Sequence, residues 1–139
     1  MVRSIQHSVA KRSGLAAVEL ALLAPLLCFL FVITIDYARI FHHSLTVTNC
    51  ARNGAVFGCL KPANALDKTG IEAAAKKDAG TLNPELMTVT ATPNNDTSPT
   101  SLSVTVTYPF STITSYVGIP SSVTVSKTSK VNVSPLTPN

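Results

Sequence analysis

The chain has 139 residues, of which 45% are hydrophobic and only 13% are charged. An average soluble domain has about 25% charged residues, so a solvated disordered tail and a charge-rich coiled coil are both excluded. The formal net charge is +4, but Arg3, Lys11 and Arg12 all lie within the first twelve positions. Because nucleic-acid binding needs basic residues clustered on a folded face, we expect no nucleic-acid partner. The length predicts one domain rather than two.

The first predicted element is an apolar run over residues 15–35, which contains a single charged residue, Glu19. As a helix it would be about 31 Å long, close to the roughly 30 Å hydrocarbon core of a bilayer, so it predicts a transmembrane helix. The first alternative is a buried helix of a soluble protein, but a small domain has too little other core to cover it. The second alternative is a cleaved secretory signal, whose apolar stretch would be about 7–15 residues long before a small-residue cleavage site. The apolar run over residues 15–35 is longer than that.

The charges beside this run predict its orientation. Three basic residues precede it, whereas Arg39 and Arg52 follow it together with Asp36. The positive-inside rule therefore places the N-terminus in the cytoplasm and the remainder outside. Glu19 would lie about one turn inside the span, where an ionisable group usually needs a partner. The alternative is an interfacial carboxylate that has no role. Pro25 is tolerated in a membrane helix, which it would bend.

A motif surrounds the start of the run. A basic leader ends in Lys11-Arg12-Ser13, Gly14 follows, and Glu19 comes after four further residues. Glycine, four residues, glutamate and then an apolar helix resembles the processing site of a type IV prepilin. The wider stretch GLAAVELALLAPLL, with DYAR at 36–39 and CARNGA at 50–55, resembles the TadE/TadG-like family of pseudopilins. These proteins are minor components of the tight-adherence, Flp-type pilus machinery. The similarity extends from Gly14 to about Gly58.

This chain departs from the family pattern at two positions. Relatives often have an aromatic residue where this chain has Leu20, and an acidic residue where it has Asn53. Neither position belongs to the processing motif.

The resemblance implies roles for three residues. A membrane aspartyl prepilin peptidase would cut after Gly14, so that Leu15 becomes the new N-terminus. Glu19 would then face the α-amino group of Leu15 in the same or a neighbouring pilin-like subunit. Opposite charges lower each other's burial cost, and they pair only in the correct register. The implied partners are the peptidase, other pilin-like subunits, membrane platform proteins and the lipid of a bacterial inner membrane.

The remainder predicts an α+β fold. The helix is expected to continue from Leu15 to Phe57, with Gly54 and Gly58 as candidate stops. A second, short helix is predicted over Ala65–Ala79, ended by Gly80.

Short alternating stretches predict the strands of a small antiparallel sheet: Leu86–Thr92, Ser101–Tyr108, Ser122–Ser126 and Lys130–Val133. One face of this sheet is apolar and needs a cover, which the long helix can provide. The predicted organisation is therefore a cleaved leader over 1–14, a transmembrane helix over 15–35 and an extracytoplasmic pilin-like domain over 36–139. A mucin-like Ser/Thr stalk is the alternative for the C-terminal part.

The cysteines offer one candidate disulfide. Cys50 and Cys59 would both lie on the oxidising side of the membrane. On a continuous helix their α-carbons would be about 13 Å apart, whereas a disulfide allows about 7 Å. A bridge would therefore need the helix to break at Asn53-Gly54 or the chain to fold back at Gly58.

No residue pattern predicts catalysis. The adjacent His42 and His43 would point about 100° apart on a helix, so they are poorly placed to chelate one metal ion. The sequence has no phosphate-binding loop, zinc pattern or arranged nucleophile. We therefore expect no enzyme activity, cofactor, metal site or small-molecule substrate.

These observations favour a membrane-anchored pseudopilin-like structural subunit that acts by assembly in a tight-adherence pilus or a related secretion-like apparatus. The alternative is a signal-anchored extracytoplasmic domain that binds a ligand or an envelope partner. It predicts that residues 1–14 stay attached.

Overall fold

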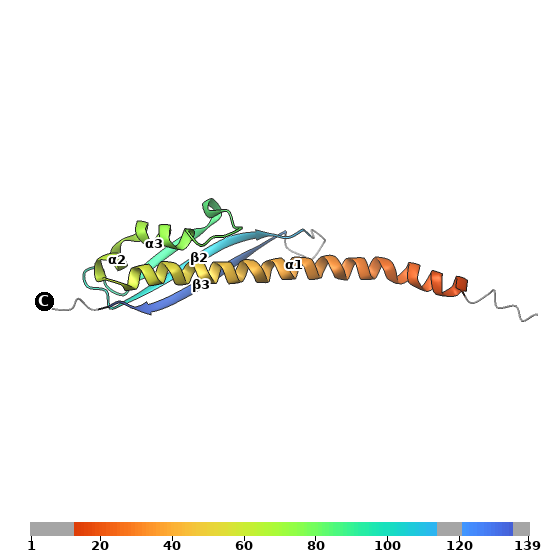
Figure 1. The fold of residues 1–139 in the computed structure, drawn as a ribbon, viewed down its shortest axis with the longest axis horizontal. Helices are drawn as coiled ribbons and strands as arrows, with labels where there is room; N and C mark the ends of the chain where they lie inside the picture. Colours follow the sequence, from red (N-terminus) through yellow and green to blue (C-terminus); the bar gives the residue numbers. More distant parts are fainter. Residues whose placement is uncertain (1–12, 114–120, 135–139) are drawn as a thin grey trace, which may run out of the picture. The chain divides into compact units, whose positions relative to one another are not determined.

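The computed structural model describes residues 13–113 and 121–134. Its elements, in chain order, are α1 (Ser13–Cys59), α2 (Pro62–Leu66), α3 (Lys68–Lys76), a 3-10 helix η1 (Pro84–Leu86), β1 (Thr88–Pro93), β2 (Ser101–Ser111) and β3 (Ser122–Asn132). The predicted α+β class is confirmed by the long apolar helix, the short helices and the antiparallel sheet (Figure 1). The chain divides into a first unit, Met1–Ile35, and a second unit, Asp36–Asn139.

The described part of the first unit is a single helical segment of α1. Most of its large apolar side chains are exposed, and Val32 and Ile33 are half-buried. The exposed ones are Leu15, Val18, Leu20, Leu22, Leu23, Leu26, Leu27, Phe29, Leu30, Phe31 and Ile35. A helix that is apolar all round needs lipid or protein around it. Among the described helices, α1 is long and apolar enough to cross a membrane, and it contains Pro25 without interruption. Residues 1–12 of the predicted leader lie outside the described residues.

The second unit is built around a three-stranded antiparallel sheet in the order β1-β2-β3. Successive side chains of a strand point to opposite faces, so the alternation along β2 gives the sheet one apolar face. The buried side chains of β2 are Leu102, Val104, Val106, Tyr108 and Phe110. The opposite face has rows of hydroxyl side chains, such as Thr90, Thr105 and Thr128, which are aligned across the three strands.

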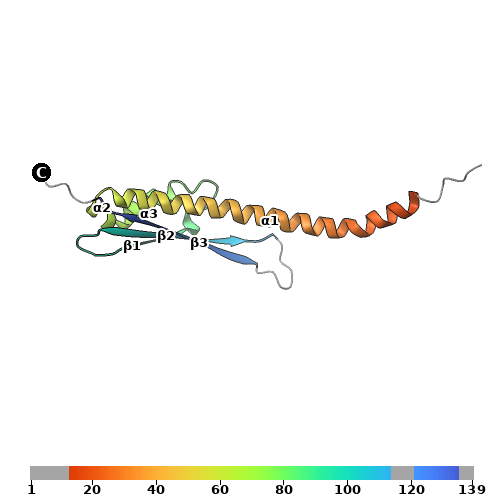
Figure 2. The same ribbon diagram turned by 90° about the horizontal axis from the view of Figure 1, so that it is seen from below.

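The part of α1 in the second unit covers the apolar face of the sheet, as the sequence predicts (Figure 2). Its fully buried side chains include Val47, Cys50 and Ala55, which share one core with β2 and with Ile71 of α3. The N–H of Ser134 donates to the carbonyl of Cys59 at 2.8 Å, which satisfies one of the free carbonyl groups at the end of α1. The helix is therefore joined to the sheet by packing and by a hydrogen bond beyond β3.

Gly54 and Gly58 do not stop the helix, which passes through both and ends at Cys59. They lie on its buried side. A Cβ atom at Gly54 would lie 3.2 Å from Val104 Cγ1, and one at Gly58 would overlap the side chain of Leu102. The two glycines therefore allow α1 to approach the sheet closely. A glycine inside a helix costs about 1 kcal/mol relative to alanine, which tertiary packing can offset.

The predicted helix over Ala65–Ala79 is in fact two helices. Asp67 separates α2 from α3 in a non-helical conformation, and its side chain caps α3 by accepting the N–H of Gly70 at 2.9 Å. Helix α3 ends at Lys76, earlier than predicted. Gly80, with φ +59°, lies in the turn that follows. A short polar side chain that can cap is favoured at a helix start over a helix interior, which explains the division at Asp67.

The two strands predicted over 122–126 and 130–133 are one strand, β3. Lys127 interrupts the apolar alternation of the sequence, but it pairs in register with Val106 of β2. Because β3 is an edge strand, the lysine stays exposed and the strand continues past it. The first strand begins at Thr88 rather than Leu86. The side chain of Asn83 accepts the N–H of Glu85 at 3.0 Å at the start of the 3-10 turn η1.

Candidate functional site

The three residues of the predicted processing and assembly site lie in the first turns of α1. A Cβ atom at Gly14 would have no neighbour within 4 Å, and the Leu15 side chain is 66% exposed. Glu19 is also exposed, and no other residue in the described ranges makes a hydrogen bond or ion pair with it. Leu15 and Glu19 are four residues apart and share one side of the helix. The arrangement leaves the Leu15 side chain exposed and the Glu19 carboxylate available to a partner.

A second cluster, which sequence reasoning missed, lies where the second unit begins. Asp36 is buried, and both of its carboxylate oxygens accept the N–H of Ile113 at 3.1 Å. Arg39 Nη1 lies 3.3 Å from Asp36 Oδ1, and its guanidinium lies 5.0 Å from the centre of the Phe110 ring. Asp36 therefore attaches the chain just beyond β2 to α1. The Asp-x-x-Arg spacing signals an ion pair on a helix, but nothing in the sequence signals Ile113 as a partner.

His43 completes this cluster as an aromatic packing residue. Its ring lies edge-on to Phe110 and Tyr108, with centroids 5.0 Å and 6.0 Å away. Its Nδ1 is buried and has no hydrogen-bond partner among the residues that the structure describes. Burial lowers the pKa of His43 below its ordinary value of 6.5, and the positive charges of Arg39 and His42 lower it further. The neutral ring is therefore the form that packs on β2.

The candidate disulfide between Cys50 and Cys59 is not formed. All three cysteines of the chain are free, and α1 runs unbroken between these two. The break or reversal on which the bridge depended is therefore absent, and two cysteines nine residues apart on a helix are too far apart to bond. Burial raises the pKa of the Cys50 thiol, and the nearby carboxylate of Asp78 raises it further. Cys50 is accordingly a packed thiol of the core.

One side of α1 in the second unit remains uncovered. We call it the outer face of α1, and it consists of six exposed residues: Tyr37, Phe41, Leu45, Asn49, Arg52 and Val56. Tyr37, Phe41 and Leu45 form an apolar patch in which each side chain is more than half exposed. Val56 begins a second patch that includes Leu60, just beyond the helix end. Exposed apolar side chains grouped in this way are typical of an interaction surface.

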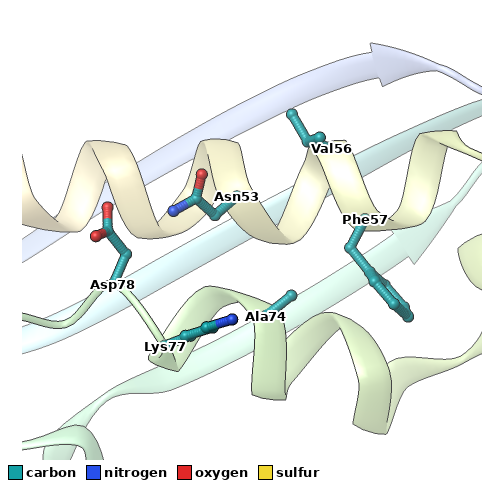
Figure 3. Close-up of a pocket in the computed structure, with 6 residues that line it drawn as sticks. All are labelled: Asn53, Val56, Phe57, Ala74, Lys77 and Asp78. Carbon is teal, nitrogen blue, oxygen red and sulfur yellow. The ribbon is translucent and has the colours of Figure 1, made fainter.

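An open groove of about 440 Å³ lies beside the outer face, between α1 and α3 (Figure 3). Its lining residues are Asn53, Val56 and Phe57 of α1 and Ala74, Lys77 and Asp78 in and after α3. Figure 3 shows Phe57 pointing from α1 toward α3. No group of three or more His, Cys, Asp or Glu side chains that could hold a metal ion occurs in the described ranges.

One protein-family model matches part of this sequence. The model described as TadE-like protein matches residues 14–56. This segment, about a third of the chain, is similar to the TadE-like family. The match includes Gly14, Leu15, Glu19, Asp36 and Arg39, and it confirms the predicted resemblance to the TadE/TadG-like family. The TadE-like family itself suggests involvement in tight-adherence pilus systems and association with pilus assembly components. Neither the curated proteins nor the solved structures include a significant match to this chain.

Proposed function

We propose that this chain is a membrane-anchored pseudopilin-like structural subunit that acts in the assembly of a tight-adherence pilus. The observation that carries the proposal is Glu19, an exposed carboxylate near the start of an apolar TadE-like helix. An ionisable group within a membrane span costs roughly 2.5–3.5 kcal/mol at the bilayer centre, so such a group usually has a partner. Among the described residues Glu19 has none, which favours a partner on another chain.

Processing would supply that partner. A prepilin peptidase would cut after Gly14 on the cytoplasmic side and give Leu15 a free α-amino group. The carboxylate of Glu19 would then pair with the amino group of a neighbouring subunit. Each charge lowers the free-energy cost of burying the other. The two groups are adjacent only when the helices are in register, so the pair favours that register. The chain would act by association, without catalysis.

The second unit has a different task in this proposal. Its sheet covers one side of α1 and leaves the outer face of α1 exposed. Pilin-like neighbours could therefore contact α1 both through its apolar N-terminal part and through the exposed side beyond residue 35.

The mature N-terminus tests the proposal. Mass spectrometry of the membrane-extracted protein, from cells that contain the cognate peptidase, should identify Leu15 as the first residue. Gly14→Leu should leave the precursor uncut, because the peptidase site would be occupied by a bulky side chain. Ala24→Leu, the control within the apolar helix, should be cut normally. An intact N-terminus on the wild-type protein would contradict the proposal and favour a signal-anchored domain.

A further inference from the structure

The outer face of α1 has one permanent charge, which lies between its two apolar patches. Arg52 is flanked on one side by Phe41 and Leu45 and on the other by Val56. It makes no ion pair or hydrogen bond with any residue in the ranges 13–113 and 121–134. The positions three and four residues away along the helix are Thr48, Asn49, Ala55 and Val56, and none of these is acidic.

Two other basic residues in the helices of the second unit are paired within the chain. Arg39 pairs with Asp36 at 3.3 Å, and Lys76 pairs with Glu72 at 2.6 Å. Arg52 thus differs from them in lacking a carboxylate that its own helix could supply. An arginine between apolar patches is suited to an interface, because burial of the patches would desolvate a charge pair at their centre.

We infer that the outer face of α1 docks a helix of a different pilin-like subunit, and that a carboxylate on that helix pairs with Arg52. This inference rests on the proposed function, since it takes the partner from the same assembly. Charge excludes a second copy that docks through the same face in parallel. Two Arg52 side chains would meet, and the outer face contains no carboxylate to separate them.

The partner helix would also cover the groove between α1 and α3. Val56 belongs both to the outer face and to the groove lining, and Asn53 lies beside it. A side chain of the docked helix can enter the groove against Val56 and Phe57, and Lys77 and Asp78 also line this groove (Figure 3). The partner is therefore an amphipathic helix with apolar side chains on both sides of one acidic residue.

Site-specific photo-crosslinking tests this inference on the full-length protein in cells that assemble the pilus. A photoreactive amino acid at Leu45 or at Val56 should crosslink to another pilin-like subunit. Peptide mapping should place the crosslink on a helix that contains Asp or Glu. The control position is Thr90, which is also exposed but lies on the hydroxyl face of the sheet, and it should give no such product. Crosslinks at Leu45 and Val56 to a second copy of this chain would overturn the inference.

Charge substitutions at Arg52 test the ion pair. Arg52→Glu should lower the crosslinking yield from Leu45 by roughly tenfold or more, because the two carboxylates would repel each other. Arg52→Lys should retain most of the yield. Both changes are on an exposed side chain, so the thermal melt of the protein should not change. Equal yields from Arg52→Glu and wild type would overturn the inference.

A third crosslinker position separates this inference from the proposed function. A photoreactive residue at Leu22 reports association through the apolar N-terminal part of α1. Crosslinks from Leu22 without any from Leu45 or Val56 would overturn the docking inference and leave the proposed function standing. Absence of crosslinks from Leu22, Leu45 and Val56 alike would contradict both the docking inference and the proposed function.

Discussion

The carboxylate of Glu19 lies on an otherwise apolar stretch of helix, where an ionised group is costly unless it is paired. We predict that Glu19→Gln removes the charge with little change in size and leaves membrane insertion unchanged or easier. Cleavage after Gly14 should persist, because the changed residue lies five positions from Gly14. Crosslinking from Leu22 to pilin-like partners and cell adherence should both decrease. Quantitative immunoblots of membranes would show normal protein levels, and unchanged crosslinking would identify Glu19 as an interfacial carboxylate without a role.

His43 should make the stability of the second unit depend on pH. Its pKa is lowered in the folded state, so the unfolded chain binds a proton more readily at this site. The stabilisation is complete above the ordinary pKa of 6.5 and decreases as the pH falls through 6.5 toward the lower folded value. The groups that face His43 from α1 are Arg39 and His42, and from β2 they are Tyr108 and Phe110. None of these is an acid that would favour a charged ring.

We therefore predict a lower melting temperature at pH 5.5 than at pH 7.5. His43→Phe keeps an aromatic ring against Phe110 and has no titrating group, so it should reduce this difference. Thermal melts of the two proteins at both pH values provide the measurement. If the melting temperature of His43→Phe differs between the two pH values as much as that of wild type, groups other than His43 cause the pH dependence.

At the level of secondary-structure elements, the close approach of α1 to the sheet depends on Gly58 more than on Gly54. An alanine methyl at Gly58 would overlap the buried Leu102, whereas the contacts at Gly54 are tight at 3.2 Å without overlap. Overpacking a core typically costs about 1–3 kcal/mol, and replacing glycine by alanine in a helix recovers up to about 1 kcal/mol. Gly58→Ala should therefore lower the free energy of unfolding by about 1–2 kcal/mol. Gly54→Ala should be close to neutral.

Urea unfolding of the two variants beside wild type tests this difference. The observation that would contradict it is a Gly58→Ala protein at least as stable as Gly54→Ala. In that case Leu102 would have to move aside at little cost.

The elements themselves could largely be predicted from local sequence. The apolar run and the alternation over 101–108 are periodic patterns, and α1 and β2 confirm them. The processing motif is a closely spaced pattern at the start of the segment that matches the TadE-like family, and its processing stays a prediction. The sequence-based predictions are wrong where contacts between distant parts of the chain determine the local structure. Gly54 and Gly58 act as packing residues because Leu102 and Val104 lie against them, and β3 continues through Lys127 because the strand lies at an edge. The same reason hides Ile113, the partner of Asp36, which is 77 residues away along the chain.

The candidate site likewise has one part that the sequence predicts and one part that only the fold shows. Gly14, Leu15 and Glu19 are visible in the sequence because they lie close together and form a motif. The outer face of α1 becomes visible only when the sheet is known to cover the opposite side of the helix. Only then is Arg52 seen as a charge between apolar patches rather than as one polar residue in a semi-apolar stripe.

On the scale of the whole molecule, the chain combines two units that are stabilised by different surroundings. The first unit exposes its apolar side chains and needs lipid or partner helices. The second unit buries its own core between α1, α3 and the sheet, so it does not depend on the membrane for that core. Asp36 is the first residue of the second unit, and its carboxylate binds the N–H of Ile113.

We therefore predict that a fragment of residues 36–139 folds without the apolar segment. It should show mixed α and β circular dichroism and a cooperative thermal melt. A fragment of residues 41–139 loses Asp36, Arg39 and the hydrogen bonds to Ile113. Hydrogen bonds to charged groups contribute about 1.5–3 kcal/mol each. For a domain of this size each kilocalorie per mole shifts the melting temperature by about 4–8 °C.

The loss of one such hydrogen bond should accordingly lower the melting temperature of the shorter fragment by about 6–24 °C, and Asp36→Asn in the longer fragment should reproduce most of that loss. Val104→Asp is the control for the core, since it buries an unpaired charge and should abolish the cooperative melt of either fragment. Calorimetry of the two wild-type fragments and these variants shows whether the start of the second unit stabilises the fold. If the two wild-type fragments melt at the same temperature, the contact between Asp36 and Ile113 does not stabilise the unit, and the sheet is held on α1 by its apolar core alone.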